Sequence, residues 1–330
     1  MKTIAFFNNK GGVGKTTLVY HLAWMFSRMG KRVVVADLDP QANLTSMFLK
    51  EDRLEDIWSD SGPGQSIMLA LSPIIRGTGD IAPAPVQKVR DSLRLIPGDL
   101  GLALFEAELS EAWGKCLDGK EPAFRTTSAF YRIIQAAGKD AKADLILIDV
   151  GPNLGAINRA ALICADAIVL PLAPDLFSLQ GLKNLGPTLK RWRSEWKTRM
   201  ALNPADDLAL PAGELRALGY VILQFGLRDS GLVKAYDRWA QKIPGIYEEY
   251  ILGPKGLSQT WDNVDDHQIA MLKHYRSLIP MAMESRKPIF ELKAADGAIG
   301  AHSYSVQSAY GDFRVLAEGI LKRLDWFDLM

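Results

Sequence analysis

The chain has 330 residues, of which 48% are hydrophobic and 23% charged, a balance that excludes an intrinsically disordered or collagen-like protein. Lysine plus arginine (39) and aspartate plus glutamate (38) leave a net charge of +1 at pH 7, so any affinity for nucleic acid or anionic lipid must come from a local patch. Cys116 and Cys164 are too few for a disulfide framework and fit a reducing cytosol. No stretch approaches the ~18 apolar residues of a membrane span.

The first forty residues predict a strand, a glycine loop, a helix and a second strand. Residues 3–7 are a short apolar run, and residues 11–14 are rich in glycine. Residues 16–29 carry apolar side chains at helical spacing, and residues 32–37 read RVVVAD. This order is a βαβ unit, which implies a parallel sheet with a right-handed crossover.

The rest of the chain continues the alternation after a break. Glycines and prolines interrupt residues 51–87, where we predict mostly loop with a short helix over residues 67–71. Residues 229–330 favour helix. The remaining pattern predicts strands over 93–96, 144–149, 167–172 and 219–225, and helices over 102–113, 123–137, 158–165, 178–196 and 305–324. We therefore expect an α/β fold, a doubly wound and mostly parallel sheet with helices on both faces and helical insertions.

One motif carries clear chemistry. Residues 10–17 read KGGVGKTT and lie between a predicted strand and a predicted helix, the context that a phosphate-binding loop requires. Glycines let successive backbone N–H groups point at phosphate oxygens, and the helix N-terminus adds partial positive charge. Lys15 would contact the β- and γ-phosphates and the Thr16 hydroxyl would ligate Mg²⁺. The strict P-loop pattern fails at its first position, where Asn9 stands, and a second lysine, Lys10, opens the loop.

This variant loop resembles that of the ParA/MinD family of dimeric ATPases. The resemblance extends to residues 37–41, which read DLDPQ, to the strand end at Asp149, and to residues 167–185. The Asp-Pro-Gln triplet is most similar to the ParA branch, which partitions plasmids and chromosomes. The similarity covers about the first half of the central fold and is looser over the last hundred residues.

The resemblance implies a single P-loop ATPase domain over residues 1–330, with insertions at about 51–90 and 229–276 that would meet a specific partner. Its cofactors would be ATP and Mg²⁺. The implied nucleotide-binding residues are Lys10, Gly11, Gly12, Val13, Gly14, Lys15, Thr16, Thr17 and Gln224, the last near the position of a base-recognising side chain. The implied metal-binding residues are Thr16, Asp37 and Asp149.

Catalytic roles are implied for Lys10, Lys15 and Asp39. Lys10 would reach across a dimer interface to the phosphates of the partner's nucleotide and neutralise charge in the transition state. Asp39 would orient the attacking water, and Asp37 would support the magnesium or the switch geometry. The bare pattern also fits two aspartates that cap a turn, although ligands in open α/β sheets bind at this end of the strands.

A basic helix is the other conspicuous feature. The segment from residue 178 carries six basic residues against Glu195, namely Lys183, Lys190, Arg191, Arg193, Lys197 and Arg199. A solvated face and a DNA contact both fit this excess. The DNA-binding candidates are Lys190, Arg191, Arg228, which is near a DNA-contacting arginine of ParA relatives, and Arg276. They would bind backbone phosphates without reading sequence.

The resemblance implies a cytoplasmic, nucleoid-associated ATPase that dimerises with ATP and binds DNA without sequence preference. A ParB-like activator or cargo adaptor would stimulate hydrolysis, so that the cycle partitions or positions DNA or protein cargo. Two alternatives stay open. One is a MinD-like positioning ATPase at a membrane or a large machine, and the other is an enzyme similar to dethiobiotin synthetase that transfers the γ-phosphoryl group to a small acceptor.

Overall fold

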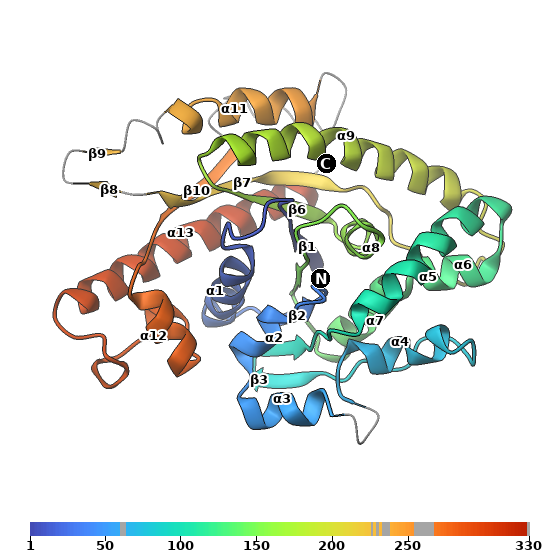
Figure 1. The fold of residues 1–330 in the computed structure, drawn as a ribbon, viewed down its shortest axis with the longest axis horizontal. Coiled ribbons are helices and arrows are strands. Elements are labelled where there is room, and N and C mark those ends of the chain that lie inside the picture. Colours follow the sequence, from blue (N-terminus) through green and yellow to red (C-terminus); the bar gives the residue numbers. More distant parts are fainter. Residues whose placement is uncertain (60–63, 226, 229–230, 233–237, 254–266, 329–330) are drawn as a thin grey trace.

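A computed structural model describes residues 1–59, 64–225, 227–228, 231–232, 238–253 and 267–328. In this part of the chain an eight-stranded sheet carries helices on both faces (Figure 1). From edge to edge its strands are β10 (Gln268–Lys273), β7 (Arg216–Phe225), β6 (Ala167–Leu172), β1 (Lys2–Phe6), β5 (Leu145–Asp149), β2 (Val33–Asp37), β4 (Leu93–Ile96) and β3 (Gln87–Arg90). Every pair is parallel except β3 with β4, which confirms the predicted doubly wound, mostly parallel sheet.

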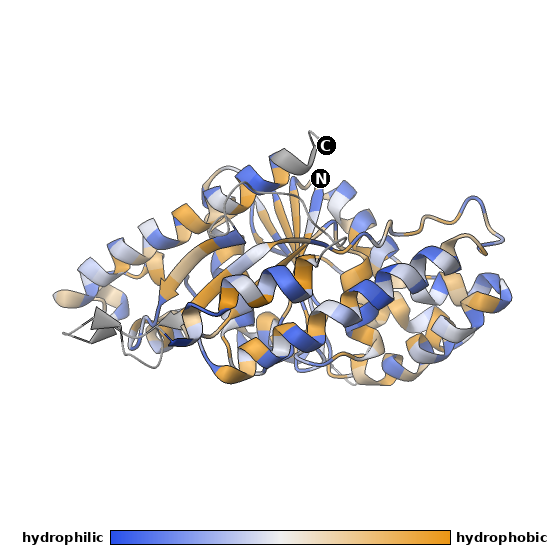
Figure 2. Ribbon diagram, turned by 90° about the horizontal axis from the view of Figure 1, so that it is seen from above, coloured by the Kyte–Doolittle hydropathy of each residue, from blue (hydrophilic) through white to orange (hydrophobic). Residues whose placement is uncertain are grey.

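The helices divide between two hydrophobic cores, one on each face of the sheet. One core contains side chains of α1 (Lys15–Arg28), α2 (Asn43–Phe48), α12 (Leu278–Ser285) and α13 (Ala301–Asp328). The other contains side chains of α4 (Ile67–Ile75), α5 (Leu102–Lys115), α6 (Glu121–Thr127), α7 (Ala129–Asp140), α8 (Ala156–Ile163), α9 (Leu176–Met200) and α11 (Ile243–Ile246). Successive strand residues alternate between the two cores, as Ile4 and Ala5 do in β1. Figure 2 shows the hydrophobic strands lying inside helices of mixed hydropathy.

Smaller elements complete the fold. They are α3 (Glu51–Ile57), the hairpin of β8 (Leu227–Arg228) and β9 (Gly231–Leu232), a π-helical turn at Tyr247–Leu252, and 3-10 turns at Cys116–Asp118, Ile289–Glu291 and Ala294–Asp296.

The two segments that sequence analysis treated as insertions contain elements that it did not predict. Residues 51–87 hold α3 and the start of β3, and the short helix expected over residues 67–71 is the longer helix α4. The glycines and prolines that break the pattern stand mainly between these elements, while α4 accommodates Pro73. The region beyond residue 229, expected to be helical, supplies β10, whose short stretch buries only Ile269 and Leu272 and so gives little alternation. Each of the two segments that the sequence marks as insertions therefore contributes an edge strand.

A third prediction needs a smaller correction. The helix expected over residues 123–137 is two helices, α6 and α7, which meet at Ser128. The backbone of Ser128 leaves the helical region there, with φ −91° and ψ 3°, and its hydroxyl donates a hydrogen bond to the carbonyl of Phe124. A side chain that bonds back to the preceding turn satisfies a helix end that the hydrophobic spacing alone does not reveal.

The register of the central strands positions the candidate site. Phe6 of β1 and Asp37 of β2 both lie opposite Asp149 of β5. Since the strands are parallel, their carboxyl ends share one edge of the sheet, and the glycine loop that leaves β1 emerges beside both aspartates. This is the edge at which open α/β sheets bind ligands.

A buried histidine fastens the glycine-loop helix to the C-terminal part of the chain. His21 of α1 is 1% exposed and stacks on the ring of Phe313 in α13, with centroids 5.0 Å apart. Its Nε2 accepts a hydrogen bond from the Ile289 N–H at 3.1 Å, so the ring hydrogen is on Nδ1, which donates to the Thr17 carbonyl at 2.7 Å. Burial lowers the pKa of His21 from 6.5 to about 4 and keeps the ring neutral.

His21 predicts a specific dependence of stability on pH. Because its pKa is lower in the folded than in the unfolded chain, its contribution is complete above pH 6.5 and is lost as the pH falls towards 4. The loss amounts to about 3 kcal/mol from a shift of this size. We expect denaturant unfolding of wild type and of His21→Gln to converge as the pH is lowered through this window. Parallel profiles for the two proteins would contradict the assignment.

Candidate functional site

The glycine loop forms the wall of a cavity. Gly12 and Gly14 adopt left-handed backbone conformations, with φ 75° and 93°, which glycine accepts without a steric penalty. The cavity has a volume of about 570 Å³. It is lined by Lys10, Gly11, Gly12, Val13, Gly14, Lys15, Thr16, Thr17, Asp39, Gln41, Asn43, Ser46, Met47, Pro152 and Met283. The structure thus brings together all eight residues of the predicted phosphate-binding loop with Asp39.

A buried ion pair lies at the base of this loop. Lys15 Nζ is 3.3 Å from Asp149 Oδ1, and the two side chains are 8% and 0% exposed. Burial raises the pKa of Asp149, while the charge of Lys15 and a hydrogen bond from Thr16 oppose that shift. Asp149 Oδ2 is buried without a hydrogen-bond partner among the described residues. A carboxylate oxygen in this state beside a threonine hydroxyl is a donor set that suits Mg²⁺.

Asp37 faces a different set of partners. Its Oδ2 accepts hydrogen bonds from the Thr45 N–H at 2.8 Å and the Thr45 hydroxyl at 2.6 Å, and its Oδ1 accepts one from the Asp39 N–H. Burial, and then the charge of Asp149, raises the pKa of Asp37 to about 7. Of its two expected roles, the geometry favours support of the segment from residue 39 to residue 45 over contact with a metal.

The loop after β5 approaches Asp39 closely. A Cβ atom at Gly151 would lie 3.3 Å from Asp39 Oδ1, so glycine permits this approach. Asn158 of α8 donates hydrogen bonds to the carbonyls of Gly151 and Asn153, at 2.7 and 2.6 Å. Glu106 of α5 accepts a hydrogen bond from the first turn of α8, at Ile157 N. Sequence analysis missed Asn158 and Glu106, and Glu106 carries no local signal because it lies 51 residues away from its partner.

The side chain of Lys10 is engaged within its own subunit. Its ammonium forms an ion pair with Asp175, the N-cap residue of α9, and lies 5.7 Å from the ring centre of Phe177. Lys10 and Asp175 are 31% and 35% exposed. Sequence analysis missed Asp175 because it predicted that the helix begins at residue 178. An aspartate just before an apolar run is a typical N-cap signal that would have identified it.

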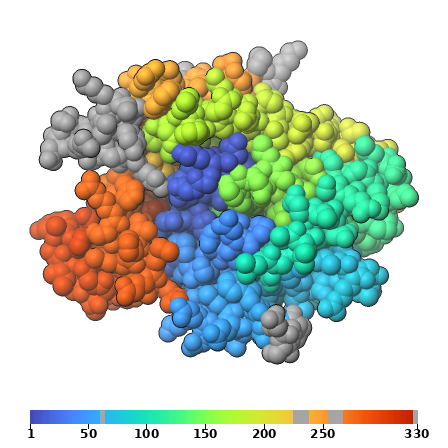
Figure 3. Space-filling model, viewed as in Figure 1, coloured from blue at the N-terminus to red at the C-terminus, as the bar shows by residue number. Residues whose placement is uncertain are grey.

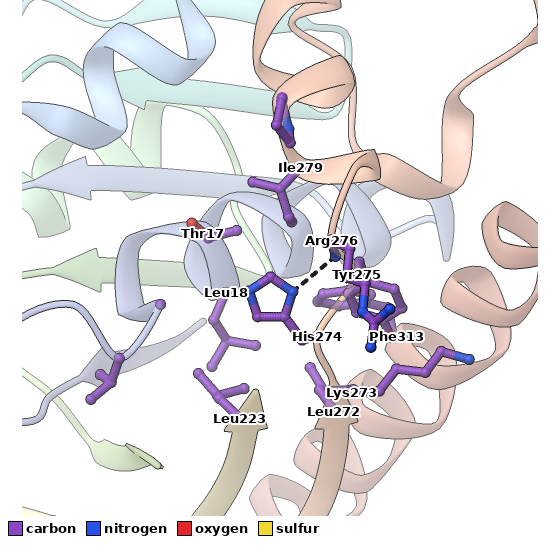
Figure 4. A pocket seen from close by; sticks show the side chains of 13 residues that line it. Thr17, Leu18, Leu223, Leu272, Lys273, His274, Tyr275, Arg276, Ile279 and Phe313 are labelled. Atoms are coloured by element: carbon purple, nitrogen blue, oxygen red, sulfur yellow. Dashed lines mark hydrogen bonds between the residues drawn. The ribbon is translucent and has the colours of Figure 1, made fainter. Parts of the chain in front are cut away.

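A second cavity of about 340 Å³ adjoins the first and shares Val13, Gly14 and Thr17 with it. Figure 4 shows His274, in the segment that follows β10, facing Thr17 and Leu18 of α1. The Arg276 N–H donates to His274 Nδ1 at 2.9 Å, so the neutral ring carries its hydrogen on Nε2. The side chain of Gln224, near this cavity at the end of β7, lies outside the described residues.

The DNA-binding candidates come from separate elements. Arg276 lines the second cavity and has a left-handed backbone with φ 42°. Arg228 lies in β8 with a side chain outside the described residues, while α9 holds the partly buried Lys190 and the exposed Arg191, whose Nε is 4.0 Å from Glu195.

Arg199 corrects the expected basic face of α9. It is only 6% exposed, its Nε donates to the Trp113 carbonyl at 2.7 Å, and its guanidinium stacks on the Trp113 ring. Among the described helices none is both long and apolar enough to cross a bilayer.

Large apolar side chains are exposed on segments that adjoin the glycine loop in the chain or in its cavity. Figure 3 shows the dark blue N-terminal residues at the centre of one face of the molecule, bordered by segments from later parts of the chain. Exposed large hydrophobic side chains come from the loop after β5, from the start of α9 and from α12. They are Leu154 (37% exposed), Leu176 (54%), Phe177 (72%) and Met283 (54%).

Comparison with known proteins agrees with this geometry. A family model described as an AAA domain matches residues 1–202. The chromosome partitioning protein ParA of Caulobacter vibrioides is 28% identical over 206 residues, 61% of this chain and 67% of that protein. The chromosome-partitioning ATPase Soj of Thermus thermophilus is 30% identical over 203 residues, which are 61% of this chain and 67% of the Soj protein.

Structural similarity extends over nearly the whole chain. The crystal structure of protein DIP2308 from Corynebacterium diphtheriae has a TM-score of 0.74 and 26% identity, and the match covers 98% of this chain and 99% of that one. With its variant phosphate-binding loop, its DLDPQ segment and Asp149 at the end of β5, the chain belongs to the ParA/MinD family of P-loop ATPases, in the partitioning branch.

Proposed function

We propose that this chain is a Mg²⁺-dependent ATPase that dimerises face to face with ATP, binds DNA without sequence preference and partitions or positions DNA or protein cargo. A ParB-like activator or cargo adaptor would stimulate hydrolysis and return the protein to its monomeric form. Its place would be the cytoplasm, on the nucleoid. The observation that carries the proposal is the single cavity in which the variant loop meets Asp39, with the Lys15–Asp149 pair at its base.

The two adjoining cavities suit the two halves of a nucleotide. The loop cavity offers backbone N–H groups, the ammonium of Lys15 and the N-terminus of α1 to the phosphates. Thr16 and Asp149 would hold Mg²⁺, which supplies positive charge next to the phosphates when bound. The second cavity has apolar walls, including Leu18 and Leu223, that suit the flat base. The Nε2–H of His274 can donate a hydrogen bond to a ring nitrogen of that base.

The surroundings of Lys10 support a dimer. Lys10 is partly exposed and lines the cavity together with Met283, and its ammonium lies 5.7 Å from the Phe177 ring centre. The side chains of Phe177, Met283, Leu154 and Leu176 are exposed to water. Burial of such side chains against a second copy would favour association. In that dimer Lys10 would approach the partner's γ-phosphate, and Asp39 would orient the attacking water.

DNA binding is proposed for Lys190, Arg191, Arg228 and Arg276. Of these, Arg191 is exposed on α9, and its distance of 4.0 Å from Glu195 leaves only a weak internal ion pair. Contact with backbone phosphates would release counterions, so the affinity would fall steeply as salt is added.

Replacement of Lys15 tests nucleotide binding. Lys15→Ala removes the ammonium that faces the phosphates and leaves Asp149 buried without its partner, so we expect at least ~100-fold weaker binding of ATP, in line with the strength of charge-assisted contacts. Calorimetric titration measures the affinity. Lys139→Ala, an exposed position on α7, serves as the control and is expected to bind ATP as wild type does. Wild-type affinity in Lys15→Ala would contradict a phosphate site here.

Replacement of His274 tests the base cavity. Loss of one hydrogen bond to the base costs about 1 kcal/mol, so His274→Leu is expected to bind ATP roughly fivefold more weakly. Inorganic tripolyphosphate lacks the base, and its affinity should be the same for both proteins. An equal loss for both ligands would show that His274 acts on the loop and not on the base.

Replacement of Asp39 and Lys10 tests the dimer switch. Asp39→Ala is expected to bind ATP without hydrolysing it and to accumulate as a dimer, whereas Lys10→Ala is expected to bind ATP and remain a monomer without turnover. Size-exclusion chromatography with light scattering, with ADP and with ATP, measures the mass, and a salt-titrated DNA shift follows on the dimer. Normal hydrolysis by Lys10→Ala would remove the trans-acting lysine from the mechanism, and a monomeric Asp39→Ala in every state would remove the dimer.

A further inference from the structure

Lys10 can act on a second subunit only after it leaves the partner that it has in its own. We propose that Asp175 is a positioning residue that holds the Lys10 ammonium in cis in the monomer and so sets the threshold for ATP-dependent dimerisation. The dimer would then form by transfer of this ammonium from Asp175 to the partner's nucleotide. This inference rests on the proposed function and adds a regulatory role to a residue outside the phosphate cavity.

The carboxylate of Asp175 is held in place by the helix that it caps. Its Oδ1 accepts a hydrogen bond from the Ser178 N–H at 2.9 Å, which caps the N-terminus of the 25-residue helix α9, while its Oδ2 accepts from Lys10. The turn before the helix is closed by two further bonds, from Asp175 N to the Ala173 carbonyl and from Ala173 N to the Ser178 hydroxyl. One carboxylate oxygen of Asp175 therefore caps the helix, and the other faces the glycine loop, where it accepts the hydrogen bond from Lys10.

The backbone of Lys10 is held against the same region. Its N–H donates to Asn8 Oδ1 at 2.9 Å, and the side-chain amide of Asn8, which is buried, donates to the Pro171 carbonyl at the end of β6. Asn9 packs so tightly on α9 that a Cβ atom at Gly181 would lie 2.5 Å from its side-chain oxygen. These contacts fix the distance between the start of the loop and the start of α9, so the ion pair orders few additional atoms.

The environment makes this ion pair weak enough to exchange. Lys10 and Asp175 are 31% and 35% exposed, so water screens their attraction, and the Phe177 ring covers the ammonium on only one side. A triphosphate enclosed between two subunits would offer more negative charge in a drier place. Asp175 would therefore oppose dimerisation in the absence of nucleotide, but it would not prevent dimerisation once nucleotide is bound.

The variant Asp175→Asn separates the ion pair from the helix cap. Asparagine caps a helix as well as aspartate does and has nearly the same shape, but it lacks the negative charge. With a non-hydrolysable ATP analogue, we expect the protein concentration at half-maximal dimerisation to fall about twofold to fivefold, the range of an exposed ion pair of this kind. The maximal turnover per dimer should stay the same, since in the dimer Lys10 no longer contacts Asp175. Damage to the fold would lower turnover instead.

Three further variants serve as controls. Asp175→Ser also keeps a capping oxygen without the charge and should shift dimerisation in the same way. Asp175→Ala removes the cap as well and should in addition lower the melting temperature. Asp144→Asn removes the exposed ion pair with Arg32 at the opposite end of β5 and should leave dimerisation unchanged.

A second measurement reports on Lys10 in the monomer. Amine acylation of the nucleotide-free protein, mapped by mass spectrometry, should label Lys10 several-fold faster in Asp175→Asn than in wild type. Equal labelling, unchanged dimerisation, or dimerisation that needs more Asp175→Asn protein would each overturn the inference. If neither wild type nor Asp39→Ala ever dimerises, the proposed function and the inferred threshold for dimerisation both fail. Faster labelling of Lys10 in Asp175→Asn than in wild type would then show only that the ion pair between Lys10 and Asp175 exists.

Discussion

The site depends on one buried contact, the ion pair between Lys15 and Asp149 at the carboxyl ends of β1 and β5. Both charges are largely buried, with the side chains of Lys15 and Asp149 8% and 0% exposed, so each is stabilised by the presence of the other. A bound triphosphate would compete with Asp149 for the Lys15 ammonium, and a divalent cation would then compensate the carboxylate. The pair of Lys15 with Asp149 would thus be replaced by two pairs, Lys15 with the triphosphate and Asp149 with the cation. Lys15 would then stabilise the empty site and bind the phosphates in the filled one.

The chain segments around this pair are held by anchors of different kinds. Asp37 and Thr45 fix the segment that carries Asp39, whereas Asn158 fixes the loop after Asp149 from the side of α8. The helix α8 is in turn tied to the outer layer, because the guanidinium groups of Arg159 and Arg199 each lie 4.2 Å from the Trp113 ring centre. A movement of the loop after β5 would be transmitted through α8 to α5 and α9.

Sequence reasoning identified what is local and missed what is distant. The eight loop residues form one contiguous motif, and strands such as β5 are buried on both faces, so periodicity and spacing reveal them. Glu106 and Asp175 act on groups 51 and 165 residues away, and a single sequence gives no signal for such pairings. The edge strands β3 and β10 were missed because they are short and bury few side chains, none in β3 and only Ile269 and Leu272 in β10, so the hydrophobic pattern is weak. Arg199 was misassigned because charge counting cannot distinguish a guanidinium that stacks on an indole ring from one in water.

The two cavities draw their residues from different parts of the chain. The family match ends at residue 202, and that part supplies the phosphate loop and all three aspartates. The second cavity also takes side chains from β7, β10 and α13, which lie beyond residue 202, through Leu223, Leu272 and Phe313. His21 joins the two parts, since it bonds to Thr17 in the loop helix and to Ile289 in the C-terminal segment. The phosphate-binding loop therefore lies in the part that the family model covers, while the walls of the second cavity come partly from the residues beyond it.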